Sequence, residues 1–438
     1  MQNKDLLIDK IKGKTAKIGI IGLGYVGLPL AVECALNGFE VHGFDIQQKK
    51  VDLVNSGHNY IADIDNLIFN EIVTSKKLTA TCDFQFIKDM DIVLICVPTP
   101  LDKHQQPDVS YVNSSAQAVG DYLRQGTLVI LESTTYPGTT EELIMPILTE
   151  RSGLICQRDF YLAFSPERVD PGNVTYKTKN TPKVVGGIGK DSTKIAALFY
   201  RNILECDVYE VSSCKVAEME KLLENTYRNI NIGLINEMAI ICNKMGISIW
   251  EVIDAAKTKP YGFQAFYPGP GLGGHCIPLD PYYLTWKARE YNYHTRLIET
   301  SGEINGYMSQ YIVERSIKIL NRFGKPLKTS KILILGIAYK NDINDYRESP
   351  ALKIIEHLQS EGSTVYFYDP YIPEYKYNDK NYLGVEMNAE TLKNVDLVII
   401  TTAHSIYDYN FIQANSKFVF DTRNAMKDVI DKKNIELL

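Results

Sequence analysis

The chain has 438 residues, which is too long for one ordinary domain and about right for two or three. Hydrophobic residues make up 45% of it and charged residues 23%, so it can bury several cores and shows no sign of general disorder. The formal net charge of −6 argues against a protein that coats nucleic acid, because such a protein needs a basic surface. A local basic pocket for a small phosphorylated ligand is compatible with this charge.

The eight cysteines, at positions 34, 82, 96, 156, 206, 214, 242 and 276, form no CxxC pair and no cluster typical of a metal site. Most lie in apolar runs, where a thiol behaves as a small hydrophobic side chain. We therefore expect no metal ion, no disulfide framework and a reducing, cytoplasmic environment. The uncharged run Ile18–Val32 is too short to cross a bilayer and is interrupted by glycines, so we expect no membrane contact and no targeting segment.

The first half of the chain alternates short apolar strands with helices. Lys17–Ile21 predicts the first strand, and a glycine-rich turn leads from it into a helix over Leu28–Asn37 that Gly38 closes. Further strands are predicted at Glu40–Asp45, Asp91–Val97, Thr127–Leu131, Tyr161–Ser165 and Val208–Val211. This alternation is typical of a doubly wound parallel sheet.

The pattern changes at Cys214. Val216–Met245 has apolar residues at helical spacing and no proline, which predicts one long helix ended by Gly246. Such a helix can connect two domains and often takes part in a dimer contact. More helix is predicted over Trp250–Lys257 and Ile298–Asn321.

A polar segment, Lys325–Ser330, predicts a linker, after which Lys331–Gly336 begins a second strand–glycine–helix unit. Its later strands are predicted at Thr364–Asp369, Asp396–Ile400 and Lys417–Asp421. This second copy keeps only one glycine of the turn, so we expect it to bind something other than a dinucleotide.

These elements predict an α/β protein with two Rossmann-like, doubly wound parallel-sheet domains, joined by a central helical domain with one long helix. The predicted boundaries are 1–213 for the first domain, 214–328 for the helical domain and 329–438 for the last.

The run Gly22-Leu-Gly24-Tyr-Val-Gly27 is a weak signal alone, but a strand precedes it, a helix follows it and Asp45 ends the next strand. Such glycines let the backbone approach a pyrophosphate, and the acid can accept hydrogen bonds from ribose hydroxyls. An acid at this position also repels a 2′-phosphate, which favours NAD over NADP. The alternative is a tight turn without a ligand.

Two further segments place hydroxyl groups where predicted strands end. Thr99 lies in Cys96-Val-Pro-Thr-Pro100 and Thr135 in Glu132-Ser-Thr-Thr-Tyr-Pro137, and ligands bind at the carboxyl ends of parallel strands. The alternative for both is simple capping of a turn. Lys221 and Asn225 lie four residues apart on one face of the long helix, as a solvated pair or as groups that point into a cleft.

The segment Tyr267-Pro-Gly-Pro-Gly-Leu-Gly-Gly-His-Cys276-Ile-Pro-Leu-Asp280 is the strongest feature. Its glycines and prolines predict a ligand-embracing loop rather than core or helix. A lone cysteine is more often a small buried hydrophobic residue, yet a thiolate stabilised by a nearby lysine would be nucleophilic at neutral pH. His275 is expected to be structural or to contact substrate, because neighbouring residues diverge in direction.

Together these motifs resemble the UDP-glucose/GDP-mannose dehydrogenase family, the UDP-sugar 6-dehydrogenases, from about Lys17 to the C-terminus. The ordered set that carries the resemblance comprises the glycine turn, Val97-Pro-Thr-Pro100, Ser133-Thr-Thr-Tyr-Pro137, Ser165-Pro-Glu167, Lys221-x-x-x-Asn225, Gly273-Gly-His-Cys276-x-Pro-x-Asp280 and Asp345-Tyr-Arg347-Glu-Ser. It implies an N-terminal NAD domain, a central domain built on the long helix, a C-terminal UDP-sugar domain and a homodimer or larger assembly.

In that family a C6 alcohol is oxidised to a carboxylate with two NAD per turnover. The resemblance implies that Cys276 attacks the C6 aldehyde to give a thiohemiacetal, which a second hydride transfer converts to a thioester that water hydrolyses. It implies that Lys221 stabilises oxyanion charge, and that Asp280 and Asn225 position water and the reacting groups. Glu167 and Thr135 match positions linked to proton transfer through water.

The resemblance also implies which residues bind the two ligands. Those expected at the cofactor are Gly22, Gly24, Tyr25, Val26, Gly27, Asp45, Thr99, Thr135 and Arg347. Those expected at the substrate are Glu167, Arg168, Lys221, Asn225, Tyr267, Gly271, Gly273 and Lys340.

Two departures bear on the sugar. Pro171 stands where the UDP-glucose enzymes carry a second glutamate, and Leu279 stands where they often have lysine. With Tyr267-Pro-Gly-Pro-Gly271 and Leu222-Leu-Glu-Asn225, these departures resemble the N-acetylhexosamine branch, which serves bacterial surface polysaccharides. UDP-N-acetyl-D-glucosamine is the expected substrate, UDP-N-acetylmannosamine the second choice and UDP-glucose the third.

Two other classes of function are compatible with parts of this pattern. A two-electron dehydrogenase of the 3-hydroxyacid type shares the Rossmann domain and the long helix, but needs no cysteine and no second nucleotide domain. A binding or sensor protein with an inactive site would not need the set Cys276, Lys221 and Asp280.

Overall fold

The computed structural model describes residues 3–61, 64–102, 104–170, 172–173, 175–274 and 276–438. The expectations for Pro171 and His275 fall outside the described residues. The chain divides into two compact units, Met1–Glu224 with Tyr282–Asn292, and Asn225–Pro281 with Tyr293–Leu438. The three domain boundaries drawn from the sequence stay predictions, since this division instead cuts the long helix.

The first unit contains an eight-stranded sheet in the order β3-β2-β1-β4-β5-β6-β7-β8, the first six strands of which have the order of a dinucleotide-binding fold. The strands are β1 (Lys17–Ile21), β2 (Glu40–Phe44), β3 (Leu78–Thr81), β4 (Ile92–Ile95), β5 (Leu128–Leu131), β6 (Tyr161–Phe164), β7 (Lys183–Gly187) and β8 (Val208–Val211). All neighbours are parallel except β6 and β7. The five predicted strands after β1 fall on strands of this sheet, whereas β3 and β7 were not predicted.

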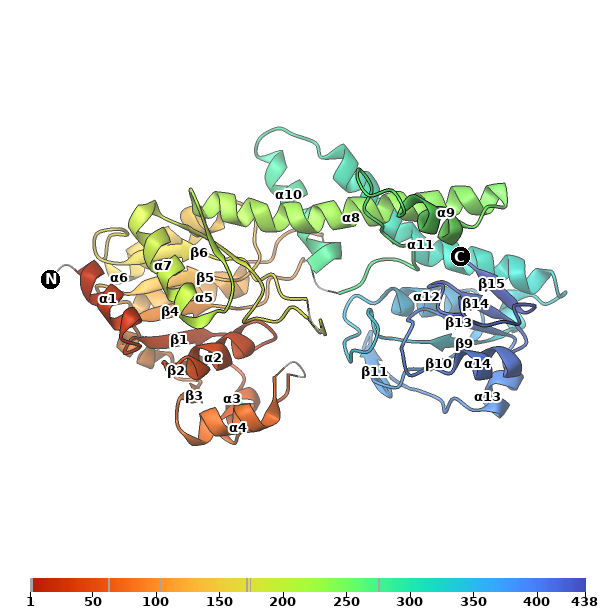
Figure 1. Cartoon of the computed structure of the whole chain (residues 1–438), viewed down its shortest axis with the longest axis horizontal. Helices are drawn as coiled ribbons and strands as arrows, with labels where there is room; N and C mark the ends of the chain where they lie inside the picture. The colour runs from red at the N-terminus through yellow and green to blue at the C-terminus, as the bar shows by residue number, and fades with distance from the viewer. Residues whose placement is uncertain (1–2, 62–63, 103, 171, 174, 275) are drawn as a thin grey trace. The chain divides into compact units, whose positions relative to one another are not determined.

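Helices cover both faces of this sheet (Figure 1). α1 (Asn3–Lys12), α2 (Gly27–Leu36) and α7 (Gly189–Ile203) pack on one face, and α5 (Ser110–Tyr122) and α6 (Met145–Ser152) on the other. Consecutive residues of β1 and β4 enter opposite cores, so after Lys17 these strands carry no polar side chain, as is usual for strands covered on both faces. The shorter α3 (Gln48–Asn55), α4 (Asn66–Thr74), η1 (Phe84–Asp89) and η2 (Thr140–Ile144) complete the unit.

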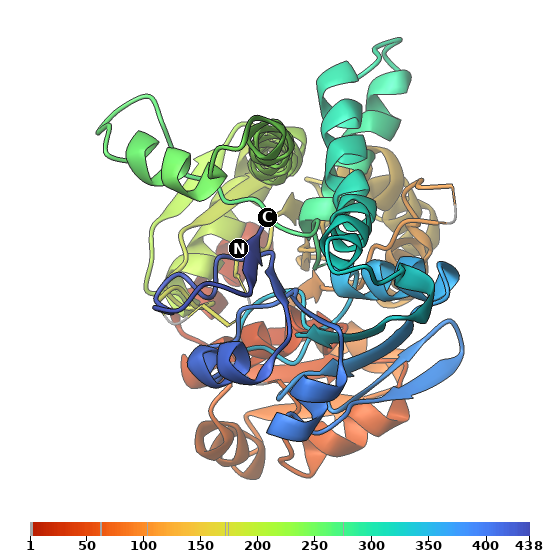
Figure 2. The same ribbon diagram turned by 90° about the vertical axis from the view of Figure 1, so that its right-hand side faces the viewer.

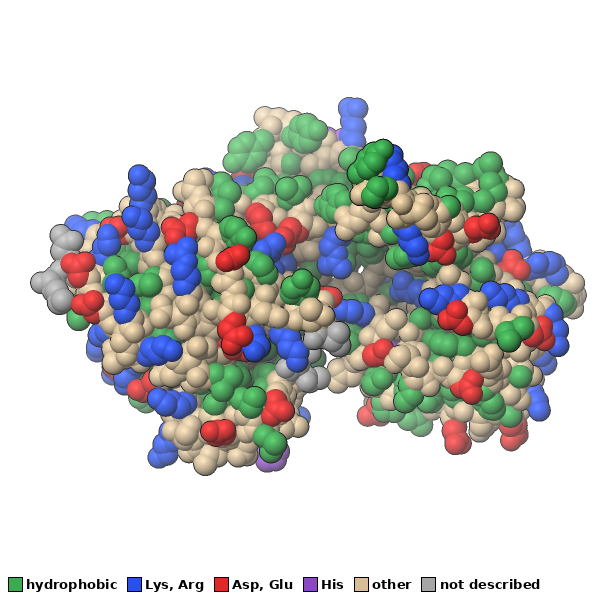
Figure 3. All heavy atoms as spheres, in the orientation of Figure 1, with side chains coloured by type: hydrophobic (Ala, Val, Ile, Leu, Met, Phe, Trp, Pro, Cys, Tyr) green, Lys and Arg blue, Asp and Glu red, His purple; other side chains and the backbone are tan. Residues whose placement is uncertain are grey.

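The predicted long helix is α8 (Cys214–Met245), seen nearly end-on in Figure 2, and Gly246 with φ +73° ends it. Apolar side chains are exposed along it at spacings of three, four and seven, and apolar side chains recur over it in Figure 3. They are Val216, Met219, Leu223, Tyr227, Leu234, Ile241 and Met245. No helix within the described ranges has both the length and the apolar character needed to cross a membrane.

Three more helices follow: α9 (Ile249–Ala256), α10 (Cys276–Arg289) and α11 (Arg296–Asn321). The first and last were predicted, but the loop expected to continue to Asp280 instead becomes helix at Cys276. Pro278 is compatible with this because the first helical turn needs no amide hydrogen from it. The glycines before residue 275 stay in a loop, and the cysteine begins a helix.

The second unit contains a five-stranded parallel sheet in the order β10-β9-β13-β14-β15. The strands are β9 (Lys331–Leu335), β10 (Thr364–Tyr368), β13 (Leu397–Ile400), β14 (Val419–Asp421) and β15 (Ile435–Leu437), with η3 (Leu327–Thr329), α12 (Pro350–Ser360), α13 (Ala389–Asn394) and α14 (Tyr409–Asn415) around them. The hairpin of β11 (Glu374–Tyr377) and β12 (Lys380–Leu383) and strand β15 were not predicted. The predicted class, two Rossmann-like sheets with a helical segment between them in sequence, is confirmed.

Candidate functional site

The glycine turn follows β1 next to β4, at the point where the strand order of the first sheet reverses. Ligands of such sheets bind there, outside the carboxyl ends of the strands. Asp45 follows β2 and is buried, and its Oδ2 accepts a hydrogen bond from Leu23 N–H at 3.0 Å. Its other oxygen accepts the Gln47 N–H at 2.9 Å, and Lys50 Nζ lies 3.3 Å from Oδ2. The predicted ribose acid therefore also holds the turn in place.

The three glycines of the turn differ in what surrounds them. A Cβ at Gly22, whose φ is +92°, would lie 2.5 Å from the Cys96 carbonyl oxygen, and a Cβ at Gly27 would lie 1.9 Å from that of Gly22. A Cβ at Gly24 would meet no atom within 4 Å. Gly22 and Gly27 are thus needed for packing, while Gly24 keeps the backbone open to a ligand, as a pyrophosphate requires. These residues fit NAD.

Of the other predicted cofactor contacts in this unit, Tyr25 is exposed and Val26 half-buried. Thr99 and Thr135 are buried, and the carbonyl of Thr99 accepts a hydrogen bond from the Tyr283 hydroxyl. Thr134 is half-buried, so it is the more accessible hydroxyl of the segment after β5. The sequence analysis passed over Thr134 because both threonines follow the same strand.

Glu167 and Lys221 come together in the first unit. Lys221 Nζ, on α8, donates a hydrogen bond to the main-chain carbonyl of Glu167 at 2.6 Å. The Glu167 carboxylate accepts the N–H groups of Arg168 and Val169, both at 2.7 Å. Burial alone would raise the pKa of Glu167, but Lys183 and these amides hold that pKa below its ordinary value.

Arg168 turns away from Glu167. Its guanidinium hydrogen-bonds Glu224 on α8 and donates to the Pro182 carbonyl at 2.8 Å. Its predicted contact with the substrate stays a prediction.

In the second unit, the half-buried Cys276 lies in the first turn of α10, and three asparagines of α8 fix the segment around it. Asn225 Nδ2 donates to Asp280 Oδ2 at 2.6 Å, and both residues are buried. Asn229 Nδ2 donates to the Ile277 carbonyl at 3.1 Å, and Asn236 Oδ1 accepts the Gly269 N–H at 3.0 Å. The last two were missed, although their spacing of four and seven residues along one helix face was a readable signal.

Pro281 explains the Asn229 contact. A proline has no N–H, so within α10 it leaves the carbonyl four residues earlier, that of Ile277, without its helical donor. The Asn229 side-chain amide supplies a donor to that carbonyl. This bond ties the turn that carries Cys276 to α8.

The predicted substrate glycines pack against the loop between β9 and α12. A Cβ at Gly273 would lie 2.5 Å from Tyr339 Cβ, and one at Gly271, whose φ is +136°, 3.1 Å from Pro350 Cβ. Gly274 N–H donates to the Arg347 carbonyl at 3.2 Å. Glycine is therefore required for the close approach of two chain segments. The approach brings the cysteine segment next to the loop that holds Lys340.

The remaining predicted ligand contacts of this unit are placed as follows. Lys340 is half-buried. The Arg347 guanidinium is about half-exposed and pairs with Asp345, at 2.7 Å between Nη2 and Oδ2. Tyr267 is exposed and stacks on Trp250, with 6.4 Å between ring centroids.

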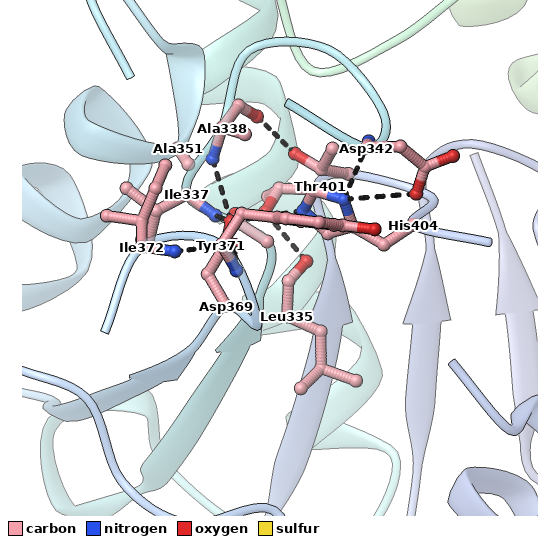
Figure 4. Close-up of polar contacts among 12 residues, drawn as sticks. Leu335, Ile337, Ala338, Asp342, Ala351, Asp369, Tyr371, Ile372, Thr401 and His404 are labelled. Atoms are coloured by element: carbon pink, nitrogen blue, oxygen red, sulfur yellow. Dashed lines mark hydrogen bonds and ion pairs between the residues drawn. The ribbon is translucent and has the colours of Figure 1, made fainter. Parts of the chain in front are cut away.

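Asp369, after β10, occupies the place in the second sheet that Asp45 has in the first (Figure 4). Its Oδ2 accepts the N–H groups of Ile337 and Ala338 at 2.6 and 2.9 Å, and His404 Nε2 lies 3.1 Å away. His404 Nδ1 accepts the Asp342 N–H at 2.9 Å, which leaves Nε2 to carry the proton. Burial alone would raise the pKa of Asp369, but the bonds from His404 and Ala338 hold that pKa below its ordinary value.

Arg423 is a further cation that the sequence analysis missed. Its Nε donates to the Thr401 carbonyl at 2.9 Å, and a Cβ at Gly269 would lie 2.5 Å from its Nη1. Burial lowers the pKa of Arg423 to about 10, which still leaves the guanidinium charged at neutral pH. It lies after β14 in the second unit, where it can bind an anion. No glycine or proline pattern marks it in the sequence.

Comparison with known proteins matches the chain in three consecutive stretches. Residues 16–204 match the NAD binding domain of the UDP-glucose/GDP-mannose dehydrogenase family, residues 215–307 its central domain and residues 333–428 its UDP binding domain. The chain is similar to Protein CapL of Staphylococcus aureus, with 36% identity over 424 residues that cover 95% of this chain and 97% of that protein.

Two further relatives carry the names of enzymes. A UDP-N-acetyl-D-glucosamine 6-dehydrogenase of Pseudomonas aeruginosa is 37% identical over 359 residues, which cover 82% of this chain and 84% of that protein. The solved structure of a UDP-D-ManNAc dehydrogenase from Pyrococcus horikoshii superposes with a TM-score of 0.86 at 31% identity, over 96% of this chain and 98% of that one.

The open glycine turn, the second nucleotide-type sheet and these matches define an NAD-dependent oxidoreductase that acts on a UDP-sugar. The chain belongs to the UDP-glucose/GDP-mannose dehydrogenase family, and the family, the enzyme class and the NAD cofactor predicted from the sequence are confirmed.

Asp369→Asn tests the acid that holds the Lys340 loop. An asparagine loses the charge that the turn amides and His404 bind, so we expect the free energy of unfolding to fall by about 1.5–3 kcal/mol at neutral pH. Because the pKa of Asp369 is lowered in the folded chain, the difference should shrink as the pH falls below the ordinary carboxyl range. Thermal unfolding measured against pH checks both. Asp379→Asn, with an almost fully exposed carboxylate beside Lys376, is the control and should change little.

Proposed function

We propose that this enzyme oxidises the C6 hydroxyl of a UDP-N-acetylhexosamine, preferably UDP-N-acetyl-D-glucosamine, to the uronic acid for surface polysaccharide synthesis. The similar enzymes from Pseudomonas aeruginosa and Pyrococcus horikoshii are named for the N-acetylglucosamine and N-acetylmannosamine nucleotides. The higher identity to the first supports the choice of sugar, and UDP-N-acetylmannosamine and UDP-glucose are the alternatives.

The observation that carries the proposal is the packing of the cysteine segment against the Lys340 loop within one unit. Gly273 and Gly274 lie against Tyr339, next to Lys340, and Arg423 lies against Gly269. A phosphate-binding cation and a nucleophile held together in this way suit a sugar nucleotide whose sugar must reach the thiol. A two-electron 3-hydroxyacid dehydrogenase has no use for either group.

The covalent step is assigned to Cys276. Its Sγ attacks the C6 aldehyde formed by the first oxidation, and the resulting thiohemiacetal is oxidised to a thioester, which water hydrolyses to the carboxylate and the free thiol. NAD, when bound, supplies the hydride acceptor for both oxidations. The asparagine contacts of α8 support this assignment, because a nucleophile must be held in one position to react efficiently.

The other roles follow from what each side chain binds. Lys221 donates to a neutral carbonyl and so keeps a positive charge available for a developing oxyanion. Asp280, oriented by Asn225, positions water and the reacting groups. The lowered pKa of Glu167 makes it a poor store for a proton, so its carboxylate is assigned to orient the water through which protons move, with the Thr135 hydroxyl after β5.

Ligand positions are assigned from the resemblance to the family. NAD is held by the Gly22–Gly27 turn, with Asp45 at the adenosine ribose and Thr99, Thr135 and Arg347 at other parts of the cofactor. The substrate is held by Lys340 at its phosphates, with Glu167, Arg168, Tyr267, Gly271 and Gly273 around the sugar and nucleotide.

We also infer a homodimer or larger homo-oligomer in the cytoplasm. The apolar side chains that are exposed along α8 support an interface, because large exposed apolar patches often mark contacts between proteins. The cytoplasmic assignment follows from the sequence, in which most cysteines lie in apolar runs and none forms a CxxC pair.

The function is tested by counting NADH formed per UDP-sugar consumed. We expect a ratio near two with UDP-N-acetylglucosamine, because oxidation of an alcohol to an acid removes four electrons. A panel of UDP-glucose and the N-acetylated glucosamine, galactosamine and mannosamine nucleotides ranks the substrates. A ratio near one would favour the two-electron dehydrogenase, and no NADH with any UDP-sugar would favour a binding protein.

Cys276→Ser tests the covalent step. A serine hydroxyl is not an activated nucleophile at neutral pH, so we expect turnover to stall at a trapped or very slowly released intermediate, with kcat lower by about a thousandfold or more. Mass spectrometry of the intact variant after incubation with substrate and NAD detects a trapped adduct. Full four-electron turnover by this variant would remove the cysteine from the mechanism. Cys82→Ser, at a half-buried thiol after β3, is the matched control.

Asp45→Ala tests the ribose assignment. Without the carboxylate a 2′-phosphate is no longer repelled, so we expect the preference for NAD over NADP, measured as the ratio of kcat/KM, to fall about tenfold. Asp45→Asn keeps an oxygen acceptor for Leu23 N–H and separates loss of charge from loss of the turn contact. An unchanged cofactor preference in both variants would show that Asp45 only supports the turn.

A further inference from the structure

Lys183, Glu132 and Tyr200 form a buried ionic network next to Glu167 in the first unit. The mechanism above does not use this network. Lys183, at the start of β7, places Nζ 2.7 Å from Glu132 Oε2 and 3.7 Å from Glu167 Oε2. Glu132 follows β5 and also accepts a hydrogen bond from the Tyr200 hydroxyl on α7. Glu132, Lys183 and Tyr200 are 1%, 5% and 0% exposed.

Such a network needs an explanation other than stability. Removing an ammonium and a carboxylate from water is costly, and apolar side chains of similar volume usually stabilise a core at least as well. What the ion pair provides here is a fixed positive charge directed at Glu167, whose own side chain is partly buried.

We propose that Lys183 is a positioning residue for the reaction: its ammonium, fixed by Glu132, holds the Glu167 carboxylate ionised and in one orientation, and thereby fixes the Glu167 carbonyl that binds Lys221. The inference rests on the proposed function, in which Glu167 orients water and Lys221 meets the oxyanion. Lys183 acts through Glu167 and needs no contact with substrate.

The contacts of Glu167 divide between its two carboxylate oxygens. Oε1 accepts the N–H groups of Arg168 and Val169, while Oε2 faces Lys183. The side chain cannot rotate without giving up both sets of contacts. Because the carbonyl of the same residue accepts Lys221 Nζ at 2.6 Å, a shift of Glu167 also moves the acceptor of Lys221.

A cavity beside these groups suits the same role. It is lined by Glu167 and Lys183 together with Leu30, Arg168, Thr181 and Leu204, and its volume is about 10 Å³. That is close to the least space that one water molecule needs. Small changes in the Glu167 carboxylate would therefore change which polar atoms reach this space.

The charged and titratable groups around Glu167 come from several segments. Lys183 on β7 and Lys221 on α8 act on its carboxylate, which in turn acts on Cys96 after β4 and Glu132 after β5. Tyr200 on α7 meets Glu132, and the guanidinium of the neighbouring Arg168 pairs with Glu224. Burial lowers the pKa of Lys183, but Glu132 and Glu167 outweigh this and raise it, so Lys183 stays charged. The lowered pKa of Glu167 means that its charge is present above the ordinary carboxyl range and is lost only as the pH falls through the lowered value.

The test replaces the ion pair by neutral side chains. Lys183→Met alone leaves two buried carboxylates without their cation, so the informative variant is Lys183→Met with Glu132→Gln, which removes both charges and keeps an amide oxygen that can accept from Tyr200. The acid limb of kcat with UDP-N-acetylglucosamine should move upward by about one to three pH units, because the opposite charge 3.7 Å from the Glu167 carboxylate is lost. KM for NAD should not change. If Lys183 and Glu132 only stabilise the fold, the pH of the acid limb will not change.

A second readout does not depend on activity. The Tm of the native enzyme is compared with that of Glu167→Gln at each pH, and the same comparison is made in the double variant. In each background the difference in Tm reports the titration of Glu167. We expect the pH at which this difference begins to change to move upward by the same interval in the double variant. The same pH dependence in both backgrounds overturns the inference. If the native enzyme forms no NADH with any UDP-sugar, the proposed function fails, while the Tm comparison still decides the role of Lys183.

Lys179→Met with Glu205→Gln is the matched control. This ion pair, 3.2 Å between Lys179 Nζ and Glu205 Oε2, is exposed on the same unit. Its removal should move neither the acid limb nor the Tm comparison. A shift equal to that of the buried pair would assign the effect to general electrostatics of the unit and overturn the specific role of Lys183.

Discussion

In each of the two large sheets, a carboxylate after the second strand accepts hydrogen bonds from the turn that follows the first strand. Asp45 binds the amide of Leu23, and Asp369 binds those of Ile337 and Ala338. These amides lie where the strand order reverses, so they are the groups that a nucleotide would approach. A hydrogen bond to a charged acceptor stabilises the turn more than a neutral hydrogen bond does. It therefore also fixes the position of the residues in the turn.

The two carboxylates differ in the number of protein groups that donate hydrogen bonds to them. Asp369 also accepts the amides of Tyr371 and Ile372 and pairs with His404, so its oxygens are surrounded by donors of the protein itself. Asp45 has fewer main-chain donors and lies beside an open position at Gly24. The same βα unit can thus offer its acid to a ribose in the first sheet and use it to hold its own loop in the second. This explains how the degenerate second turn keeps its shape with one glycine.

Much of this could be predicted from the sequence, because apolar runs and glycine turns are local signals. The sequence predicted the strands around both turns, α8 and the family motifs. β3 and β7 were not, because Leu-Thr-Ala-Thr and Lys-Val-Val-Gly-Gly carry little apolar periodicity, and β7 is antiparallel to β6. The helical start of α10 was missed because its prolines read as loop, and Pro281 is tolerated only through a contact to Ile277 from Asn229, 48 residues earlier. Contacts of that range leave no local pattern.

Five cations in and around the proposed site fall into two groups by the charge of their hydrogen-bond partners. Lys183, Arg168 and Arg347 meet carboxylates, which neutralise them and fix the chain around them. Lys221 and Arg423 instead donate to carbonyl groups, of Glu167 and Thr401. A carbonyl orients a cation without cancelling its charge, so the field of Lys221 and Arg423 is still available to an anion. The pKa of Arg423 is lowered because the cost of burying the guanidinium exceeds the favourable effect of the Asp421 carboxylate. By this criterion Lys221 and Arg423 keep their charge available to a ligand, and Lys183 is suited to holding a neighbouring carboxylate.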